Sequence, residues 1–286
     1  MANLKEIRTR ITSVASTMQI TSAMKMVSAA KLKRAQDAIT QMRPYAEKLS
    51  EILVNLSATL ENSTEDIYSQ EREIKKVLLV SIASNRGLCG AFNANVFKAT
   101  EKRVHQLSDS TVLVYPIGKR AVDYFTGKHE LYSSNLEIFN DLNFNSSTEI
   151  AQEIMDAFVE GSFDKVEIIY NEFVNAATQN IITETFLPVS SDQTESNAIQ
   201  SDYLFEPSKA SIVLNLIPKS LKIQLYKCLL DSHASEHGAR MTAMHKATDN
   251  AQDLKDDLTL TYNRQRQAAI TNEILEIVGG AEALKQ

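Results

Sequence analysis

Two groups of residues in this sequence have types and spacings that chemistry could use. One is the segment 84–90, SNRGLCG, which combines glycines with a cysteine, Cys89, after an apolar run. Glycine-rich turns between a strand and a helix cradle phosphates, and a thiol at a helix N-terminus becomes more nucleophilic. The other is the pair His233 and His237, which have the spacing of two metal ligands on one helical face. The sequence therefore raises three hypotheses: a nucleotide site, a catalytic cysteine and a metal site.

The glycine-containing segment lacks the rest of a nucleotide or nucleophile site. It has Gly87 and Gly90, but neither the GxGxxG nor the GxxxxGK[ST] pattern. Glycines are expected at this point because a strand must turn sharply into a helix. A catalytic cysteine needs a base, and the sequence places neither His105 nor His129 near Cys89. We therefore expect no cofactor and a structural or incidental role for Cys89.

The histidine pair also lacks a complete ligand set. Glu236 does not stand where the HExxH pattern requires it, and no third ligand is implied. We expect no metal and no catalytic residue, and we interpret the pair as a solvated or core-edge contact. Cys89 and Cys228 show no zinc or disulfide pattern, which suits a reducing compartment. With no run of eighteen apolar residues and no apolar N-terminal segment, we expect a cytoplasmic protein.

The element that dominates the N-terminus is a heptad pattern over residues 1–60. Only Thr21, Lys25 and Ser28 interrupt its two apolar lines. A helix of about 55 residues would be roughly 80 Å long, so it must pack lengthwise on a partner helix. Pro44 should kink this helix without breaking it, because the heptads continue in phase past it. The a and d positions are Leu4, Ile7, Ile11, Val14, Met18, Thr21, Lys25, Ser28, Leu32, Ala35, Ile39, Met42, Ala46, Leu49, Leu53, Leu56 and Leu60.

A second long helix is expected over residues 208–286. Residues 219–278 are rich in good helix formers and contain no proline and a single glycine, Gly238. Small side chains in this stretch allow close helix approach, so the two terminal helices should pair antiparallel. Its apolar spacing is less regular and passes through Met241, Met244, Leu254, Leu258, Ile270, Ile274 and Ile277.

The middle of the chain, residues 75–190, has the pattern of a separate domain. Apolar runs alternate with helical stretches, which predicts a parallel or mostly parallel sheet, and a polar segment at 190–202 predicts a mobile loop. The fold class is therefore α/β: an antiparallel coiled coil of long N- and C-terminal helices plus a central Rossmann-like α/β domain. The predicted strands are 77–83, 111–117, 166–173 and 180–189, and the predicted helices lie near 91–107, 118–126 and 147–160.

Charge is distributed unevenly along the chain. Residues 1–60 hold nine Lys and Arg against four acidic residues, a net charge of +5, whereas the whole chain carries −6. Such an arm suggests an acidic partner, whether protein, nucleic acid or lipid headgroup, although a solvated helix face is the plain alternative. Residues 1–44 contain no aromatic side chain on which bases could stack. A coiled-coil adaptor that binds an acidic protein or nucleic acid, and a small nucleotide-dependent enzyme with helical arms, stay open as alternatives.

Four segments together resemble one family. They are 20–36 (ITSAMKMVSAAKLKRAQ), 84–90, 235–251 (SEHGARMTAMHKATDNA) and 262–284 (YNRQRQAAITNEILEIVGGAEAL). In this order they are similar to motifs of the gamma subunits of bacterial-type F-type ATP synthases, and the resemblance covers essentially the full chain. It implies a rotor shaft whose coiled coil lies inside a ring of three alpha and three beta subunits. The α/β domain would lie against epsilon and the membrane c-ring.

The resemblance also implies the work of this subunit. Proton flow would turn the c-ring and the shaft, and the shaft would drive the beta subunits, which carry out the ATP chemistry, through their binding states. The chain itself would be non-catalytic and would lie peripherally on the cytoplasmic face of the cell (inner) membrane. The dithiol insertion of chloroplast gamma subunits is absent, so we predict no thiol switch, and a polar ending at 282–286 departs from the family's small apolar one.

The same resemblance assigns candidate contact residues. Basic residues near the gap in the heptads would meet acidic lever segments of beta, and an Arg-Gln pair near the C-terminus would engage its catch loop. For each of them, an ordinary exposed helix residue is the alternative. The basic residues are Lys25, Lys31, Lys33 and Arg34; the Arg-Gln pair is Arg266 and Gln267; the other implied beta contacts are Arg86, Cys89, Arg240 and Thr271; and the apolar bearing tip is Ile270, Ile274, Ile277 and Val278.

Overall fold

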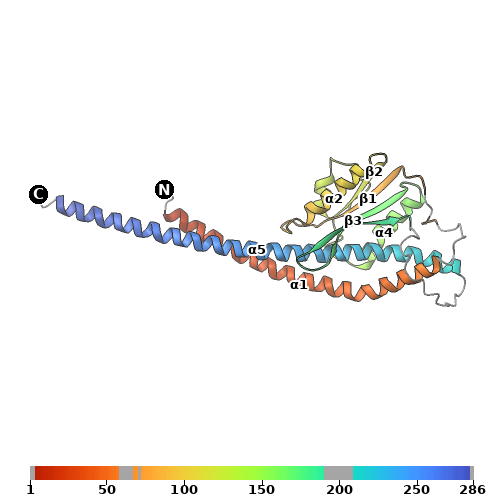
Figure 1. Ribbon diagram of the computed structural model, residues 1–286, viewed down its shortest axis with the longest axis horizontal. Coiled ribbons are helices and arrows are strands. Elements are labelled where there is room, and N and C mark those ends of the chain that lie inside the picture. The colour runs from red at the N-terminus through yellow and green to blue at the C-terminus, as the bar shows by residue number, and fades with distance from the viewer. Residues whose placement is uncertain (1–3, 58–66, 70–71, 190–208, 284–286) are drawn as a thin grey trace. The chain divides into compact units, whose positions relative to one another are not determined.

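The computed structural model describes residues 4–57, 67–69, 72–189 and 209–283 (Figure 1). The segment 190–202, for which we predict a mobile loop, lies outside these residues. The chain divides into two compact units, residues 1–28 with 241–286 and residues 29–240. The elements are α1 (Leu4–Ser57), β1 (Lys76–Ile82), α2 (Phe92–Gln106), β2 (Thr111–Ile117), α3 (Lys119–Phe125), α4 (Phe144–Val159), β3 (Lys165–Phe173), β4 (Gln179–Leu187) and α5 (Lys209–Ala283).

The heptad pattern of α1 is the seam along which it is buried. Every a and d position from Leu4 to Leu49 is at least partly buried, including the polar Thr21 and Ser28. In the first unit, Thr21 Oγ1 lies 2.8 Å from Thr248 Oγ1 of α5, and the two hydroxyls share a hydrogen bond. The residues that look like interruptions are therefore part of the seam. The two helices run antiparallel in this unit, as predicted (Figure 1).

On α5 the seam follows a spacing of alternately four and three residues. It passes through Met244, Thr248, Ala251 and Leu258, all at least partly buried, and the small Ala251 is only 8% exposed. Leu254 is 50% exposed, so its assignment to the apolar face is wrong: it lies one position away from the seam, which continues at residue 255. Every residue from 270 to 281 is exposed.

The helix α1 continues through Pro44 without a break, as predicted. Figure 1 shows its orange, C-terminal part turning away from the direction of the preceding turns. In this second unit α1 also contacts α5, because the ammonium of Lys219 lies over the ring of Tyr45, 5.8 Å from its centroid. A proline removes one backbone hydrogen bond, and packing of this kind keeps the helix in place around it.

The middle of the chain forms the mostly parallel sheet that the alternation predicts. The strand order is β2-β1-β3-β4, with β1 parallel to both neighbours and β4 antiparallel to β3. Residues Val77–Ile82 of the central strand β1 are fully buried, since helices cover both faces of the sheet. Each strand agrees with its prediction to within two residues at either end.

Different helices cover the two faces of this sheet. On one face, Val96 of α2 packs with Val77 and Leu79 of β1. On the other face lie α4 and the first half of α5, and α5 contributes Leu221, Leu225 and Leu229 to the main core. The helix α5 therefore serves the sheet as well as the coiled coil. The predicted domain limits, 1–60, 75–190 and 208–286, follow the elements and stay a prediction.

Candidate functional site

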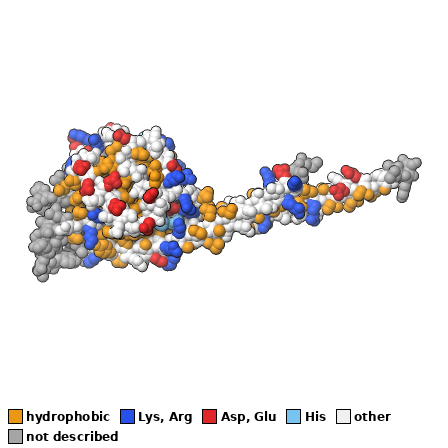
Figure 2. All heavy atoms as spheres, turned by 180° about the vertical axis from the view of Figure 1, so that it is seen from behind, with side chains coloured by type: hydrophobic (Ala, Val, Ile, Leu, Met, Phe, Trp, Pro, Cys, Tyr) orange, Lys and Arg blue, Asp and Glu red, His pale blue; other side chains and the backbone are white. Residues whose placement is uncertain are grey.

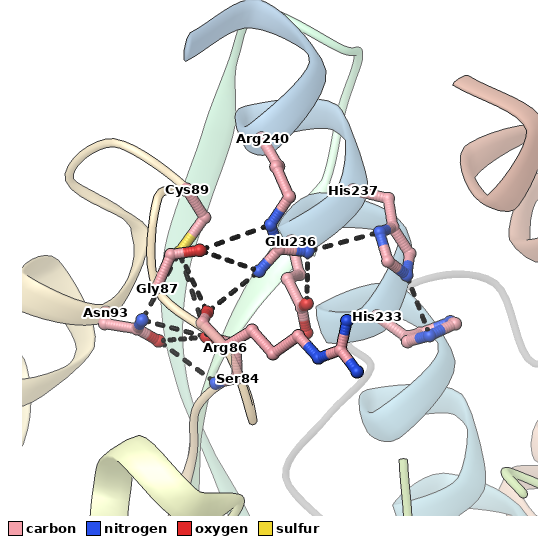
Figure 3. A network of polar contacts seen from close by, with 9 residues as sticks. All are labelled: Ser84, Arg86, Gly87, Cys89, Asn93, His233, Glu236, His237 and Arg240. Atoms are coloured by element: carbon pink, nitrogen blue, oxygen red, sulfur yellow. Dashed lines mark hydrogen bonds and ion pairs between the residues drawn. The ribbon is translucent and has the colours of Figure 1, made fainter. Parts of the chain in front are cut away.

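The segment between β1 and α2 is folded around its own polar side chains. The backbone N–H of Ser84 donates to Asn93 Oδ1 at 3.0 Å, the Asn93 amide donates to Ser84 Oγ at 2.8 Å, and Ser84 Oγ donates to the Arg86 carbonyl at 2.7 Å (Figure 3). Both Leu88 and Gly90 have positive φ angles, +63° and +61°. We call residues 84–90 the β1–α2 loop. Because the Asn93 and Ser84 side chains fill its inside, the arrangement does not resemble an open phosphate cradle.

Cys89 lies inside this loop. Its side chain is 1% exposed, and its sulfur accepts from the Asn93 amide at 3.3 Å. Burial raises the pKa of the thiol, against smaller opposing effects of Ser84 and Arg240, so the sulfur stays protonated at neutral pH. A structural role agrees with this environment. The assignment of Cys89 as a partner contact stays a prediction, for which its side chain offers almost no exposed surface in the free chain.

Arg240 of α5 binds the same loop through its guanidinium. Its guanidinium donates to the Arg86 carbonyl at 2.8 Å and to the Gly87 carbonyl at 3.3 Å (Figure 3). It also forms an ion pair with Glu236, one turn earlier on the helix, and it is 6% exposed. Burial raises the pKa of Glu236, and Arg240 acts in the opposite direction. We predicted Arg240 as a contact for beta, but the structure turns its charge inward, since two loop carbonyls and a buried carboxylate occupy its donors.

The two histidines continue this network. His237 Nδ1 lies 3.4 Å from Arg240 Nη1, a donor, and His237 Nε2 lies 3.1 Å from His233 Nε2. The nitrogen beside the guanidinium must accept, so His237 carries its proton on Nε2 and donates it to His233. Burial lowers the pKa of His237 to about 3 and of His233 to about 4, helped by the neighbouring cations Arg240 and Lys31. Both rings are neutral at pH 7.

This network gives the histidines a packing role. The ring of His233 stacks on Phe139 with centroids 5.9 Å apart, and His237 is buried. Of the two interpretations of the pair, a solvated or a core-edge contact, the burial of His237 and the partial burial of His233 favour the core-edge contact. Among the described residues there is no group of three or more His, Cys, Asp and Glu side chains that could hold a metal ion.

The basic residues of α1 lie on the helix surface. Lys31, Lys33 and Arg34 are exposed, whereas Lys25 is partly buried at its seam position. Lys33 forms an i, i+4 ion pair with Asp37 at 2.7 Å, with both side chains more than half exposed. Part of the positive charge that the sequence assigns to an acidic partner is therefore matched locally.

The last turns of α5 expose apolar side chains. Ile270, Ile274, Ile277 and Val278 share one helical face, and all four are exposed. Leu275 is exposed beside them and was missed by the sequence analysis. So many large apolar side chains along about three turns indicate a surface that a partner covers. Among their polar neighbours Arg266, Gln267 and Thr271 are exposed too, and Thr271 Oγ1 donates within the helix to the Gln267 carbonyl.

These features define a class of protein: a stalk-type subunit, in which an α/β domain is inserted between two long antiparallel helices. Comparison with known proteins gives the particular family. A family model described as ATP synthase matches residues 3–284. The ATP synthase gamma chain of Flavobacterium johnsoniae is 63% identical over 284 residues, which cover 99% of each chain. The ATP synthase gamma chain of Geobacter sp. strain M21 is 43% identical over 287 residues, which cover 100% of each chain.

Solved structures agree with this relationship. The central stalk and c-ring structure of the Tetrahymena thermophila mitochondrial ATP synthase contains a chain that is 28% identical, with a TM-score of 0.62, over 80% of this chain and 99% of that one. A chain of the Euglena gracilis mitochondrial ATP synthase matches the fold with a TM-score of 0.71 at 22% identity, over 98% and 94% of the two chains.

The chain therefore belongs to the ATP synthase gamma chain family and is a central-stalk subunit of that ATPase complex. These relatives do not support the alternative of an adaptor for an acidic protein or nucleic acid. Across the described helices, none has an apolar stretch long enough to cross a membrane.

Proposed function

We propose that this chain is the rotor shaft of a proton-translocating ATP synthase and does no chemistry itself. It couples rotation of the c-ring to the conformational changes of the catalytic beta subunits. The observation that carries this proposal is the pairing of a continuous helical seam, from Leu4 to Leu49, with an exposed apolar end at residues 270–281. A long seamed pair of helices resists bending, and an apolar end needs a bearing.

The partners follow from the family. We propose that three alpha and three beta subunits surround the coiled coil, and that epsilon and the c-ring contact the α/β domain. The chain would then lie peripherally on the cytoplasmic face of the cell (inner) membrane, with no cofactor of its own. The proposed beta contacts that keep an exposed or partly exposed side chain are Lys25, Lys31, Lys33, Arg34, Arg86, Arg266, Gln267 and Thr271, and the proposed bearing tip is Ile270, Ile274, Ile277 and Val278.

The chemistry of the candidate site supports a non-catalytic role. Its thiol, Cys89, is protonated and buried, and His233 and His237 are neutral and packed against each other. The charges of Arg240 and Glu236 neutralise each other. None of these groups is poised to attack or to accept a proton from a substrate.

Purification of the tagged chain from its own membranes tests the proposal. We expect alpha, beta and epsilon subunits to co-purify with ATPase activity, and the free chain to be inactive. Reconstitution with alpha and beta should raise nucleotide hydrolysis above that of the two subunits without the chain. A free chain that hydrolyses nucleotide, or one that brings down nucleic acid in place of these subunits, would overturn the proposal.

A further inference from the structure

His233 and His237 connect the β1–α2 loop to groups that can take up protons. Arg240 donates to two carbonyls of the loop, and its Nη1 lies 3.4 Å from His237 Nδ1. His237 Nε2 in turn lies 3.1 Å from His233 Nε2. One row of polar contacts therefore runs from the loop through the guanidinium to both imidazole rings (Figure 3). The proposed rotor function makes no use of these rings.

This row of contacts has a single satisfied arrangement of protons. His237 accepts through Nδ1 and donates through Nε2, and His233 accepts that bond. A proton added to His237 Nδ1 would face the N–H groups of Arg240. A proton added to His233 Nε2 would face the N–H of His237. Either proton sets two donors against each other, so the closed network cannot take up a proton without losing a contact.

The charged groups around the rings also oppose an added proton. Lys31 of α1 and Arg240 of α5 act on both rings, and the ring of Phe139 that stacks on the pair brings no charge. Glu236 is already paired with Arg240, and Lys31 and Arg86 of the loop act on it too. Figure 2 shows Lys and Arg side chains gathered beside the pale-blue histidine on one edge of the globular unit. Three cations against one carboxylate make the network positive even while both rings are neutral.

We propose that His233 and His237 form a proton-operated latch on the β1–α2 loop. While both rings are neutral, the latch keeps Arg240 on the loop carbonyls. A proton on either ring displaces the guanidinium and opens the loop, and the rest of the α/β domain stays folded. The inference goes beyond the proposed function, because it gives this domain a response to acidification that does not depend on any partner.

The open loop sets the pH range of this response. In the closed network the pKa is about 4 for His233 and about 3 for His237, whereas rings exposed to water in the open loop regain the ordinary value of 6.5. The open form therefore binds protons first, and its population rises as the pH falls from 6.5 toward 4. From pH 7 to pH 5 the ratio of open to closed loops should rise about 500-fold if both rings become solvated, and about 20-fold for one ring.

The buried thiol of Cys89 reports this opening in the free, full-length chain. A pyridyl disulfide is the probe, because it reacts with thiols in acid as well as at neutral pH. The rate at each pH is divided by the rate of glutathione at the same pH, which removes the titration of the thiol itself. We expect the normalised rate of Cys89 to rise about 500-fold from pH 7 to pH 5. Cys228 lies in the main core and should stay unreactive, which separates opening of the loop from unfolding.

Glutamine variants of the two histidines test the mechanism. The amide oxygen of glutamine accepts and its amide nitrogen donates, as a neutral ring does, but the amide does not titrate. His233→Gln and His237→Gln should each reduce the rise to about 20-fold, and the double variant should reduce it to less than about threefold. His105→Gln, at an exposed histidine of α2, is the matched control and should keep the wild-type rise. Circular dichroism at each pH checks folding, and the single variants suffice if the double variant does not fold.

Three results would overturn the latch: a wild-type rise below about fivefold, a rise that both single variants leave unchanged, and labelling of Cys228 together with Cys89. The last result would mean that acid unfolds the whole domain. None of them bears on the rotor proposal, which fails only if the chain does not assemble with alpha and beta subunits or hydrolyses nucleotide alone.

Discussion

At Gly238, α5 lies close against the turn between β3 and β4. A Cβ added there would lie 3.2 Å from the Cα of Ala176, 3.3 Å from its carbonyl oxygen and 3.5 Å from the ring of Phe173. Ala176 belongs to the turn between β3 and β4. Asn175 braces this turn, since its side-chain oxygen accepts from the backbone N–H groups of residues 177 and 178. The nearest atoms are therefore backbone atoms of a braced turn, which cannot yield as the end of a flexible side chain would.

The expected effect of Gly238→Ala on the free energy of unfolding follows from two opposing contributions. Alanine is more favourable than glycine inside a helix by about 0.8–1.0 kcal/mol. Inserting a methyl group into a packed contact typically costs about 1–3 kcal/mol. Because the contact is tighter than nine in ten real Cβ contacts, the packing cost should prevail. We expect Gly238→Ala to lower the free energy of unfolding by about 1 kcal/mol.

Urea unfolding followed by circular dichroism measures this change, with Gly279→Ala as the matched control. Both glycines lie inside α5, but a Cβ at Gly279 would meet nothing within 4 Å. The control should therefore be neutral or stabilising by up to about 1 kcal/mol, the helix propensity alone. If both variants are stabilised to the same degree, the close approach at Ala176 does not constrain α5 and the reasoning is wrong.

Three further predictions concern polar contacts inside the fold. In the coiled coil, a double-mutant cycle of Thr21→Val and Thr248→Val should give a coupling energy of about 0.5–1 kcal/mol, measured by urea unfolding; zero coupling would mean that the hydroxyls do not bond in solution. In the α/β domain, Glu167 is buried and its pKa is lowered, because its bonds to Arg103 at 2.6 Å and to Lys165 outweigh the burial that would raise it. Arg103→Met should destabilise by about 2–4 kcal/mol at pH 7 and by less in acid, because a proton can then neutralise the buried carboxylate that the variant leaves without its arginine; an equal loss at neutral and acidic pH would contradict this. For the histidines, the folded-state pKa values of about 4 for His233 and about 3 for His237 lie below the ordinary value of 6.5. The unfolded chain therefore binds protons first, and the free energy of unfolding should fall as the pH drops from 6.5 toward 4. His237→Gln should flatten this slope in a comparison of unfolding midpoints.

The elements of this fold could be predicted because their periodicities are strong. Heptads repeat through α1, and β1 and β2 are uninterrupted apolar runs bounded by turn residues. Even Thr21 and Ser28 follow the register, although their side chains are polar. On α5 the seam uses small and polar residues such as Ala251 and Thr248, so hydrophobicity alone chose Leu254 wrongly. The core role of α5 was missed for a related reason, since a helix that packs on a sheet and a helix that packs on a helix have similar apolar spacing.

The candidate site was harder to predict, because its function depends on which way side chains turn. Arg240 is a charged residue of the kind usually found at protein surfaces. Only the fold shows that its guanidinium binds two loop carbonyls and Glu236. Glu236 four residues before Arg240 was the available signal for an internal pair. Leu88 had no such signal, since a positive φ at a leucine follows from the contacts around it and not from its own preference.

The placement of charge distinguishes contacts that stay fixed from contacts that a rotor must exchange. The pair of Arg240 and Glu236 is buried, and removing one partner of a buried pair costs about 3–5 kcal/mol because the other charge is left unpaired. Lys33 and its partner Asp37 are exposed, and such pairs contribute about 0.2–1 kcal/mol. A shaft that passes each surrounding subunit in turn needs the second kind on its outside.

We therefore expect Lys33→Gln to leave assembly with alpha and beta, and the hydrolysis rate of the complex, within about twofold of wild type. Arg240→Gln should lower both the hydrolysis rate of the complex and the thermal stability of the free chain, because it acts through the fold of the β1–α2 loop. Both variants are reconstituted with alpha and beta at matched subunit concentrations, and their hydrolysis rates are compared with that of wild type. A large loss of activity in Lys33→Gln with unchanged stability would show that a single exposed cation carries the coupling, and the division between buried and exposed charge would then be wrong.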